Sequence, residues 1–158
     1  MFRAIRRKKR EIPEADARAL LHSARWGVLA MNGVEGYPYA VPVNFLYDEQ
    51  AGKIYFHGAK AGHKAQALAL CDRVCFTVCG EETVRKEAWA PYVRSTVVFG
   101  HCRPLESTPE TMELLKRLAM KYYPDEETAD MEIAADGKAV RLYAIEIAHL
   151  SGKEVQEK

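Results

Sequence analysis

The segment Tyr37–Tyr47, with the sequence YPYAVPVNFLY, carries the clearest structural signal in the chain, because large side chains alternate along it with smaller or polar ones. Alternation with a period of two predicts a β-strand that buries one face. Pro42 lacks the amide hydrogen that a ladder needs, which makes a central place in a sheet awkward. The buried face would carry Tyr39, Val41, Val43, Phe45 and Tyr47, and the other face Ala40, Pro42, Asn44 and Leu46.

Five further strands are predicted on either side of this one, so we expect six in all. They cover residues 26–31, 53–57, 73–79, 92 to about 102, and 140–149. Helical spacing predicts helices at 14–25, 64–71, 109–123 and near 126–134, whereas residues 81–91 have no clear period and are expected to be loop or partial helix. Without β-α-β alternation, the order favours a mainly β protein, an antiparallel barrel with short helices.

Length and charge limit the classes of partner. The chain has 158 residues, and we expect residues 1–158 to form a single domain. Its 23 Lys and Arg balance 22 Asp and Glu, so the net charge of +1 supplies no general field for nucleic acid or an anionic membrane. The basic segment Arg3–Arg10 leads into Glu11, Pro13 and Glu14 rather than the apolar run of a signal peptide. We therefore expect a solvated arm, with no nucleic-acid or membrane partner.

Four cysteines in a chain without an export signal predict reduced thiols and a cytoplasmic location. The spacing of Cys71, Cys75 and Cys79 would align them on a helix, but the residues between them are typical of a strand. On a strand, Cys75 and Cys79 would stand about 13 Å apart, which is too far to bind one metal ion. We expect no metal site, and we interpret these thiols and Cys102 as buried and structural.

The segment Lys53–Lys64, KIYFHGAKAGHK, predicts a strand, a glycine-bearing turn and the first turn of a helix. A helix N-terminus has free amide hydrogens and partial positive charge, which suit a phosphate group. Lys60 and Lys64 add charge, although the Walker pattern is absent. A solvated loop is the alternative interpretation of this turn.

Several motifs occur in an order that resembles one known family. They are RKKREI at 7–12, GVLA at 27–30, GYPYAVPVNF at 36–45, GKIYFHGA at 52–59, GHK at 62–64 and RVCF at 73–76. Together they are similar to the FMN-binding split barrels related to pyridoxamine 5'-phosphate oxidase, in particular the nitroimidazole-resistance branch. The resemblance covers most of the chain and implies a six-stranded antiparallel split barrel. It also implies a homodimer with one FMN in each of two clefts between the subunits.

The resemblance also implies which residues contact the cofactor. The strand at Pro42, Val43 and Asn44 would lie along the flavin ring, and Ser95 and Val97 would close the cleft from the partner subunit. The phosphate side would comprise Phe56, His57, Gly58, Ala59 and Lys64. Gly58 departs from the family pattern, which has a serine there, so one phosphate contact is missing or is replaced by backbone.

Three activities are compatible with this resemblance. The leading one is an FMN-dependent oxidoreductase that takes electrons from NADH or NADPH and passes them to a small organic or nitroaromatic acceptor. A pyridoxamine 5'-phosphate oxidase-type oxidase is an alternative, although no Arg-rich substrate motif precedes the end of the chain. A non-catalytic flavin or haem binding or sensing protein is the other. A flavin carries the reactive chemistry itself, which fits the lack of a recognisable catalytic triad or carboxylate pair.

The histidines differ in their expected roles. His57 lies beside the predicted phosphate turn and is the best candidate for a catalytic imidazole. His63 is either a second anion contact or an exposed residue at the helix start. Trp89 lies in a loop, where it would wall the cleft or simply pack. The histidines expected to be structural are His22, His101 and His149.

Overall fold

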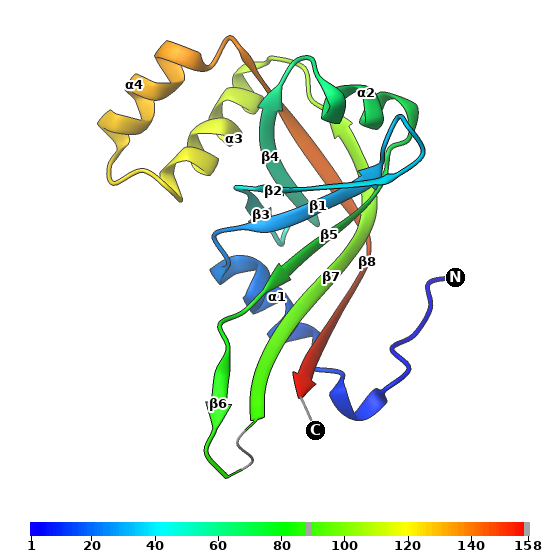
Figure 1. The fold of residues 1–158 in the computed structure, drawn as a ribbon. Coiled ribbons are helices and arrows are strands. Elements are labelled where there is room, and N and C mark those ends of the chain that lie inside the picture. The colour runs from blue at the N-terminus through cyan, green and yellow to red at the C-terminus, as the bar shows by residue number, and fades with distance from the viewer. Residues whose placement is uncertain (88–89, 157–158) are drawn as a thin grey trace.

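A single bent β-sheet dominates the computed structural model, which describes residues 1–87 and 90–156 (Figure 1). The strands are β1 (Gly27–Asn32), β2 (Pro38–Val43), β3 (Leu46–Asp48), β4 (Lys53–Ala59), β5 (Arg73–Cys79), β6 (Thr83–Arg85), β7 (Ala90–Pro104) and β8 (Val140–Gln156). The helices are the 3-10 turn η1 (Lys8–Arg10), α1 (Glu14–Ser23), α2 (His63–Leu70), α3 (Pro109–Met120) and α4 (Glu126–Asp136). No helix in these two ranges is both long and apolar enough to cross a membrane.

The strands pair antiparallel in the order β2-β1-β5-β7-β8-β4-β3, and β6 adds to one end of β7. The two outermost strands, β2 and β3, are consecutive in the chain and are joined by Asn44 and Phe45. The sheet therefore curls until its edges meet at these two residues. Within the described ranges no ladder joins β2 to β3, so the barrel is split along this line.

The predicted mainly β, antiparallel split barrel is confirmed, with eight strands rather than six. Residues 37–47 form β2 and β3 instead of one strand, and residues 81–91 contain β6. Val43, Phe45 and Tyr47 are all buried, so the alternation continues through the break. These side chains continue to point into the barrel while the chain passes from one edge of the sheet to the other. The sequence pattern therefore does not show where β2 ends and β3 begins. Pro42 lies on an edge strand, as its missing amide hydrogen required.

Aromatic contacts organise the interior of the barrel. Phe45 packs edge-on against Phe76, with ring centroids 4.9 Å apart, and Phe56 stacks on Tyr143 at 5.2 Å. A Cβ atom at Gly27 would lie 2.1 Å from Cζ of Phe76. Glycine at this position therefore lets the Phe76 ring approach the β1 backbone, which a larger residue would prevent.

The helices cover the barrel at two places. α1 buries Ala17 and Leu21, and the buried hydroxyl of Thr96 donates to the Ala17 carbonyl at 2.9 Å. α3 and α4 form a hairpin beside β4 and β8, where a second apolar cluster includes Leu115 and Leu118. Met112, on the same helix, is exposed. Thr108 and Thr111 form a capping box at the start of α3.

The thiols differ from their predicted environment. Only Cys102 is buried, Cys71 and Cys75 are half-buried, and Cys79 is exposed. β5 has one buried face, and Cys75 and Cys79 both lie on the other, so the prediction that they are buried was wrong. Desolvation raises the pKa of the Cys102 thiol to about 12. Trp89, predicted to wall the cleft or simply to pack, lies outside the described residues.

Candidate functional site

The turn between β4 and α2 is shaped to receive an anion. Gly62 precedes the helix with φ at +112°, a conformation that L side chains rarely adopt. The first turn of α2 has neither a side-chain cap nor an acidic residue. Its amide hydrogens are therefore left without a capping side chain at the positive end of the helix dipole, an arrangement that favours negative charge.

Lys64 is the half-buried cation of this turn. A Cβ atom built at Gly58 would lie 2.9 Å from both Cε and Nζ of Lys64, so the lysine fills the space of the absent side chain. Its ammonium also lies 5.4 Å from the ring centroid of Phe56. Within the described part of the chain it makes no hydrogen bond or ion pair, and burial lowers its pKa. The turn thus holds a partly desolvated positive charge that has no counter-ion among the described residues.

His57 lies on β4, one residue before Gly58. The residue is exposed at the surface, yet enough protein surrounds its ring to desolvate it in part. This partial burial and the charge of Lys64 both lower the pKa of His57 below its usual 6.5. The imidazole is therefore neutral at pH 7 and has one ring nitrogen available to accept a proton.

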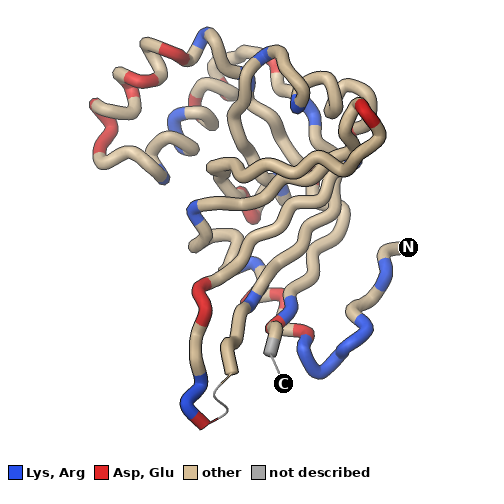
Figure 2. Tube along the Cα trace, viewed as in Figure 1, with Lys and Arg blue, Asp and Glu red and all other residues tan. Residues whose placement is uncertain are grey.

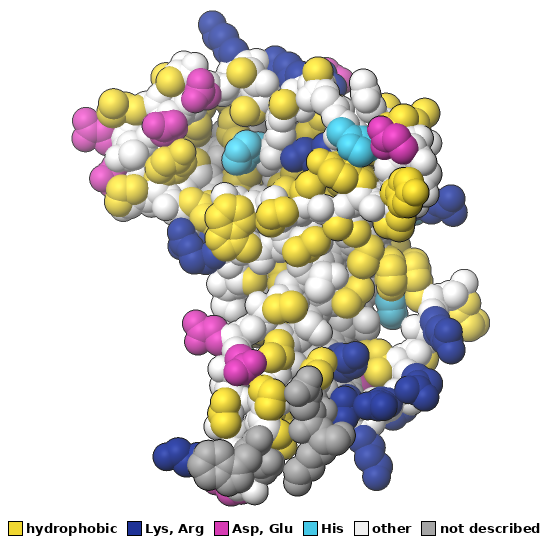
Figure 3. All heavy atoms as spheres, viewed as in Figure 1, with side chains coloured by type: hydrophobic (Ala, Val, Ile, Leu, Met, Phe, Trp, Pro, Cys, Tyr) yellow, Lys and Arg dark blue, Asp and Glu magenta, His cyan; other side chains and the backbone are white. Residues whose placement is uncertain are grey.

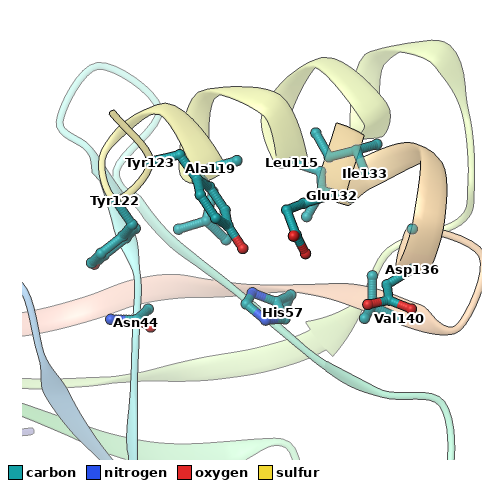
Figure 4. A pocket seen from close by; sticks show the side chains of 12 residues that line it. Asn44, His57, Leu115, Ala119, Tyr122, Tyr123, Glu132, Ile133, Asp136 and Val140 are labelled. Carbon is teal, nitrogen blue, oxygen red and sulfur yellow. The ribbon is translucent and has the colours of Figure 1, made fainter. Parts of the chain in front are cut away.

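A pocket of about 250 Å³ opens between His57 and the α3–α4 hairpin (Figure 4). Asn44 and His57 form its floor, and the carboxylates of Glu132 and Asp136 point toward it from α4. The rest of the wall is mostly apolar or aromatic. It comprises Leu115, Leu118, Ala119, Tyr122, Tyr123, Ile133, Gly137 and Val140.

The end of α3 satisfies backbone groups at the split. The hydroxyl of Tyr122 lies 2.8 Å from the carbonyl oxygens of Arg25 and Phe45 and accepts from the Phe45 amide at 2.8 Å. Lys121 donates to the carbonyl oxygens of Ala24 and Phe45 at 2.7 and 3.1 Å. Burial and the nearby charge of Arg25 lower the pKa of Lys121 to about 8. The side-chain nitrogen of Asn44 donates to the Arg25 carbonyl at 3.1 Å, which holds Asn44 at the split between β2 and β3.

The other residues predicted to contact the phosphate or the flavin ring lie in different parts of the barrel. The side chains of Val43 and Phe56 lie in the barrel interior, so only their backbone atoms are accessible to a ligand. Ala59 ends β4 on the surface, and its carbonyl accepts from the Tyr143 hydroxyl at 3.3 Å. The ammonium of Lys60, in the same turn, donates a hydrogen bond to the carbonyl of Lys138. The structure thus gathers Asn44, His57, Gly58 and Lys64 at one end of the barrel.

Pro42 and Val97 lie in one cross-strand row on the outer face of the sheet. The pairing runs from Pro42 to Val28, then to Thr77, Val97 and Ser151. Three strand spacings separate Pro42 from Val97, which is about 14 Å. The parallel row comprises Ala40, Ala30, Cys75, Phe99 and His149. Ser95 and Val97 face a different pocket, beneath the N-terminal arm.

Two of the residues that line this pocket, Asn44 and His57, were candidates from the sequence, and the residues of its cover were not. The residues Lys121, Tyr122, Glu132 and Asp136 were not candidates. Tyr122 contacts Phe45 across 77 positions of sequence. A helix period shows which residues share a face, but it does not show which distant strand that face meets.

Comparisons with known proteins agree with this architecture. Residues 13–154 match the family model described as pyridoxamine 5'-phosphate oxidase. No curated protein matches the sequence.

Solved structures of three bacterial proteins share the fold. One is a proposed 5-nitroimidazole antibiotic resistance protein from Bacteroides thetaiotaomicron, with a TM-score of 0.76, 19% identity and coverage of 92% of this chain and 87% of that chain. An FAD-binding protein from Mesorhizobium loti has a TM-score of 0.67 and 21% identity, covering 92% and 97%. A flavocytochrome from Azotobacter vinelandii has a TM-score of 0.72 and 18% identity, covering 95% and 71%. At these identities the likeness shows the fold alone.

Proposed function

The chain belongs to the pyridoxamine 5'-phosphate oxidase family, and on this premise we propose that it is an FMN-binding oxidoreductase that works as a homodimer. The observation that carries the proposal is the half-buried ammonium of Lys64, which has no counter-ion among the described residues and lies at the start of a helix. We further propose a cytoplasmic location, which its four free thiols support.

The phosphate of FMN would bind at the turn between β4 and α2. A dianionic phosphate would pair with Lys64 and with the amide hydrogens at the start of α2. Lys64 fills the space that a serine at position 58 would take, so it replaces the hydroxyl that Gly58 lacks. A terminal phosphate held in this way suits a mononucleotide.

The flavin ring would lie toward the split, beside Pro42 and Asn44. One N–H of Asn44 is held by the Arg25 carbonyl, which orients the amide. The amide oxygen takes no part in that bond and would accept from an N–H on the polar edge of the ring. The exposed Pro42 side chain on β2 offers an apolar surface for the ring face.

FMN, when bound, supplies hydride transfer from NADH or NADPH to a small organic or nitroaromatic acceptor. The residues of this chain bind, orient and shield it. His57 is neutral at pH 7 and would hold or donate a proton at a ring nitrogen on the floor of the pocket. The apolar side chains of α3 and α4 would limit the access of water.

The outer face of the sheet supports a homodimer. Figure 3 shows hydrophobic side chains gathered over the front of the sheet, where β1, β2, β5 and β7 lie. Val28 is 44% exposed there, whereas Phe99 is 39% exposed and has the Phe2 ring stacked on it. A twofold pairing of this face would bring Val97 of one copy toward Pro42 of the other, which a single copy keeps far apart. The cofactor would then bind only the assembled state.

Reconstitution tests the proposal directly. We expect FMN to bind and to stay with the protein through gel filtration, with the absorbance maxima of a flavin. Riboflavin, which lacks the phosphate, should bind at least tenfold more weakly because it cannot use Lys64. Mass spectrometry of the ligand released on denaturation identifies it. Recovery of FAD, a Soret band from haem, or equal affinity for riboflavin would contradict the proposal. Oxidation of NADH or NADPH by the loaded protein then separates an enzyme from a carrier.

Asn44→Leu should shift the reduction potential of bound FMN and slow its reduction, with a smaller loss of FMN affinity than that caused by removing Lys64. Leucine keeps the approximate volume but removes both the donor and the acceptor at the ring edge. Potentiometric titration and binding isotherms of the two variants make the comparison. If the potential stays within error of the parent, the role of Asn44 is confined to its bond with Arg25.

A further inference from the structure

The N-terminal arm is attached to the sheet at two places rather than solvated along its length. Near η1, the Ile12 amide donates to the Gly152 carbonyl at 3.1 Å, and Glu11 forms a bridge with Lys153. At the other end, the Phe2 ring stacks on the His149 ring, with centroids 4.9 Å apart. Residues 3–10 therefore cross the surface of the sheet between these two attachment points.

The part of the sheet beneath this segment consists of three successive cross-strand pairs of β7 and β8. These are Ser95 with Lys153, Val97 with Ser151, and Phe99 with His149. Phe2 covers the third pair, stacking also on Phe99 at 5.6 Å, and the bridge from Glu11 meets the first. Neighbouring pairs on one face are about 7 Å apart, so the middle pair is left as a floor beneath the arm. The pocket measures about 450 Å³ and is lined by Ile5, Arg6, Arg7, Arg10, Ser95, Val97, Ser151 and Lys153.

The lining is strongly cationic. It carries three arginines and one lysine, and no carboxylate. Within residues 1–87 and 90–156, the side chains of Arg6, Arg7 and Arg10 make no ion pair or hydrogen bond. Glu11, the nearest acid in sequence, pairs with Lys8 at 3.0 Å. Figure 2 shows the resulting run of basic residues along the N-terminal segment, on a chain whose net charge is only +1.

We propose that this arm pocket binds the phosphate group of a nucleotide. Guanidinium groups form paired hydrogen bonds with phosphate oxygens, and the hydroxyls of Ser95 and Ser151 supply neutral donors on the floor. The anchored arm places Arg6, Arg7 and Arg10 around this floor, so three guanidinium groups line one pocket of about 450 Å³. A pocket of this size suits a single phosphate or pyrophosphate group better than the repeated phosphates of a nucleic-acid strand.

Two sources could provide this group, the 5'-phosphate of FMN and the phosphates of a nicotinamide dinucleotide. The proposal does not depend on the phosphate contact at Lys64, because Lys64 does not line the arm pocket; the residues that the arm pocket shares with the proposed FMN cleft of the dimer are Ser95 and Val97. Measuring in a Lys64→Met background therefore isolates the arm pocket, and failure of one proposal leaves the other standing.

The test uses inorganic pyrophosphate, titrated calorimetrically at about 0.15 M salt, where diffuse attraction is largely screened. Arg6→Gln and Arg10→Gln should each weaken binding about tenfold, because each removes a charge-assisted contact. Lys9→Gln is the matched control, since Lys9 is exposed on the same arm but does not line the pocket. An equal loss in Lys9→Gln, or no loss in either arginine variant, would overturn the proposal.

Protection of the arm from trypsin gives a second readout. Pyrophosphate should slow cleavage after residues 6–10 in the parent and not in Arg6→Gln/Arg10→Gln. Competition then identifies the source: displacement of pyrophosphate by FMN but not riboflavin indicates the flavin phosphate, and displacement by NADPH more than NADH indicates the 2'-phosphate of the dinucleotide. Tighter binding of a duplex DNA, with equal losses in all three variants, would instead assign the arm to nucleic acid and overturn the proposal.

Discussion

Lys64→Met should lower the affinity for FMN about ten- to a hundredfold, the equivalent of about 1.5 to 3 kcal/mol. Methionine keeps most of the side-chain volume against Gly58 and Phe56, so the change removes the charge rather than the packing. The loss is large because the ammonium is already partly desolvated before the phosphate arrives. Affinity for riboflavin should not change. FMN titrations followed by flavin fluorescence give both values.

Lys60→Met is the matched control from the same turn. Lys60 is exposed and bonds the Lys138 carbonyl, so its removal should change FMN affinity by less than about threefold. Equal effects of the two substitutions would mean that FMN senses only the general charge of the turn. An unchanged titration in Lys64→Met would remove Lys64 from the site.

The pH dependence of FMN binding follows from the same charge. In the protein without FMN, burial lowers the pKa of Lys64 below its usual value of 10.5. A bound phosphate would raise this pKa again. The contact is therefore complete at neutral pH, and affinity falls as alkaline pH removes the proton. Lys64→Met should lose this decrease.

Val28→Glu should convert the dimer to a monomer and lower FMN affinity at least a hundredfold. Val28 lies in the outer row, between Pro42 and Thr77. Enclosing an unpaired carboxylate in an interface costs about 3 to 5 kcal/mol. FMN binding falls with dimerisation because the proposed cleft needs both copies. Sedimentation velocity and FMN titration report the two losses, and the thermal transition reports whether the barrel is intact.

Val34→Glu is the corresponding control. Val34 is 45% exposed, against 44% for Val28, but it lies in the turn between β1 and β2 rather than in the outer rows. It should leave both the dimer and FMN binding unchanged. A Val28→Glu protein that remains a dimer, or a monomer that binds FMN normally, would contradict the proposed interface.

Local patterns predicted the elements well because each depends on residues close in sequence. The alternation of residues 37–47 identified the buried face, since every second side chain of a strand points the same way. Pro42 correctly indicated an edge position, and Gly62 and Lys64 marked the turn between β4 and α2. The same local reasoning placed Cys75 and Cys79 on one strand face, but it wrongly took that face to be buried.

The amino-acid sequence by itself determined the antiparallel β class, the faces of the strands and the position of the cationic turn, because period and turn chemistry are properties of short segments. Only the tertiary structure decided that the sheet edges meet at Asn44, that Tyr122 closes this gap, and that the arm crosses β7 and β8 above Ser151. It also decided that Lys64 occupies the space left by Gly58. These arrangements depend on packing between residues far apart in the chain, and short-range periodicity contains no information about which distant surfaces meet.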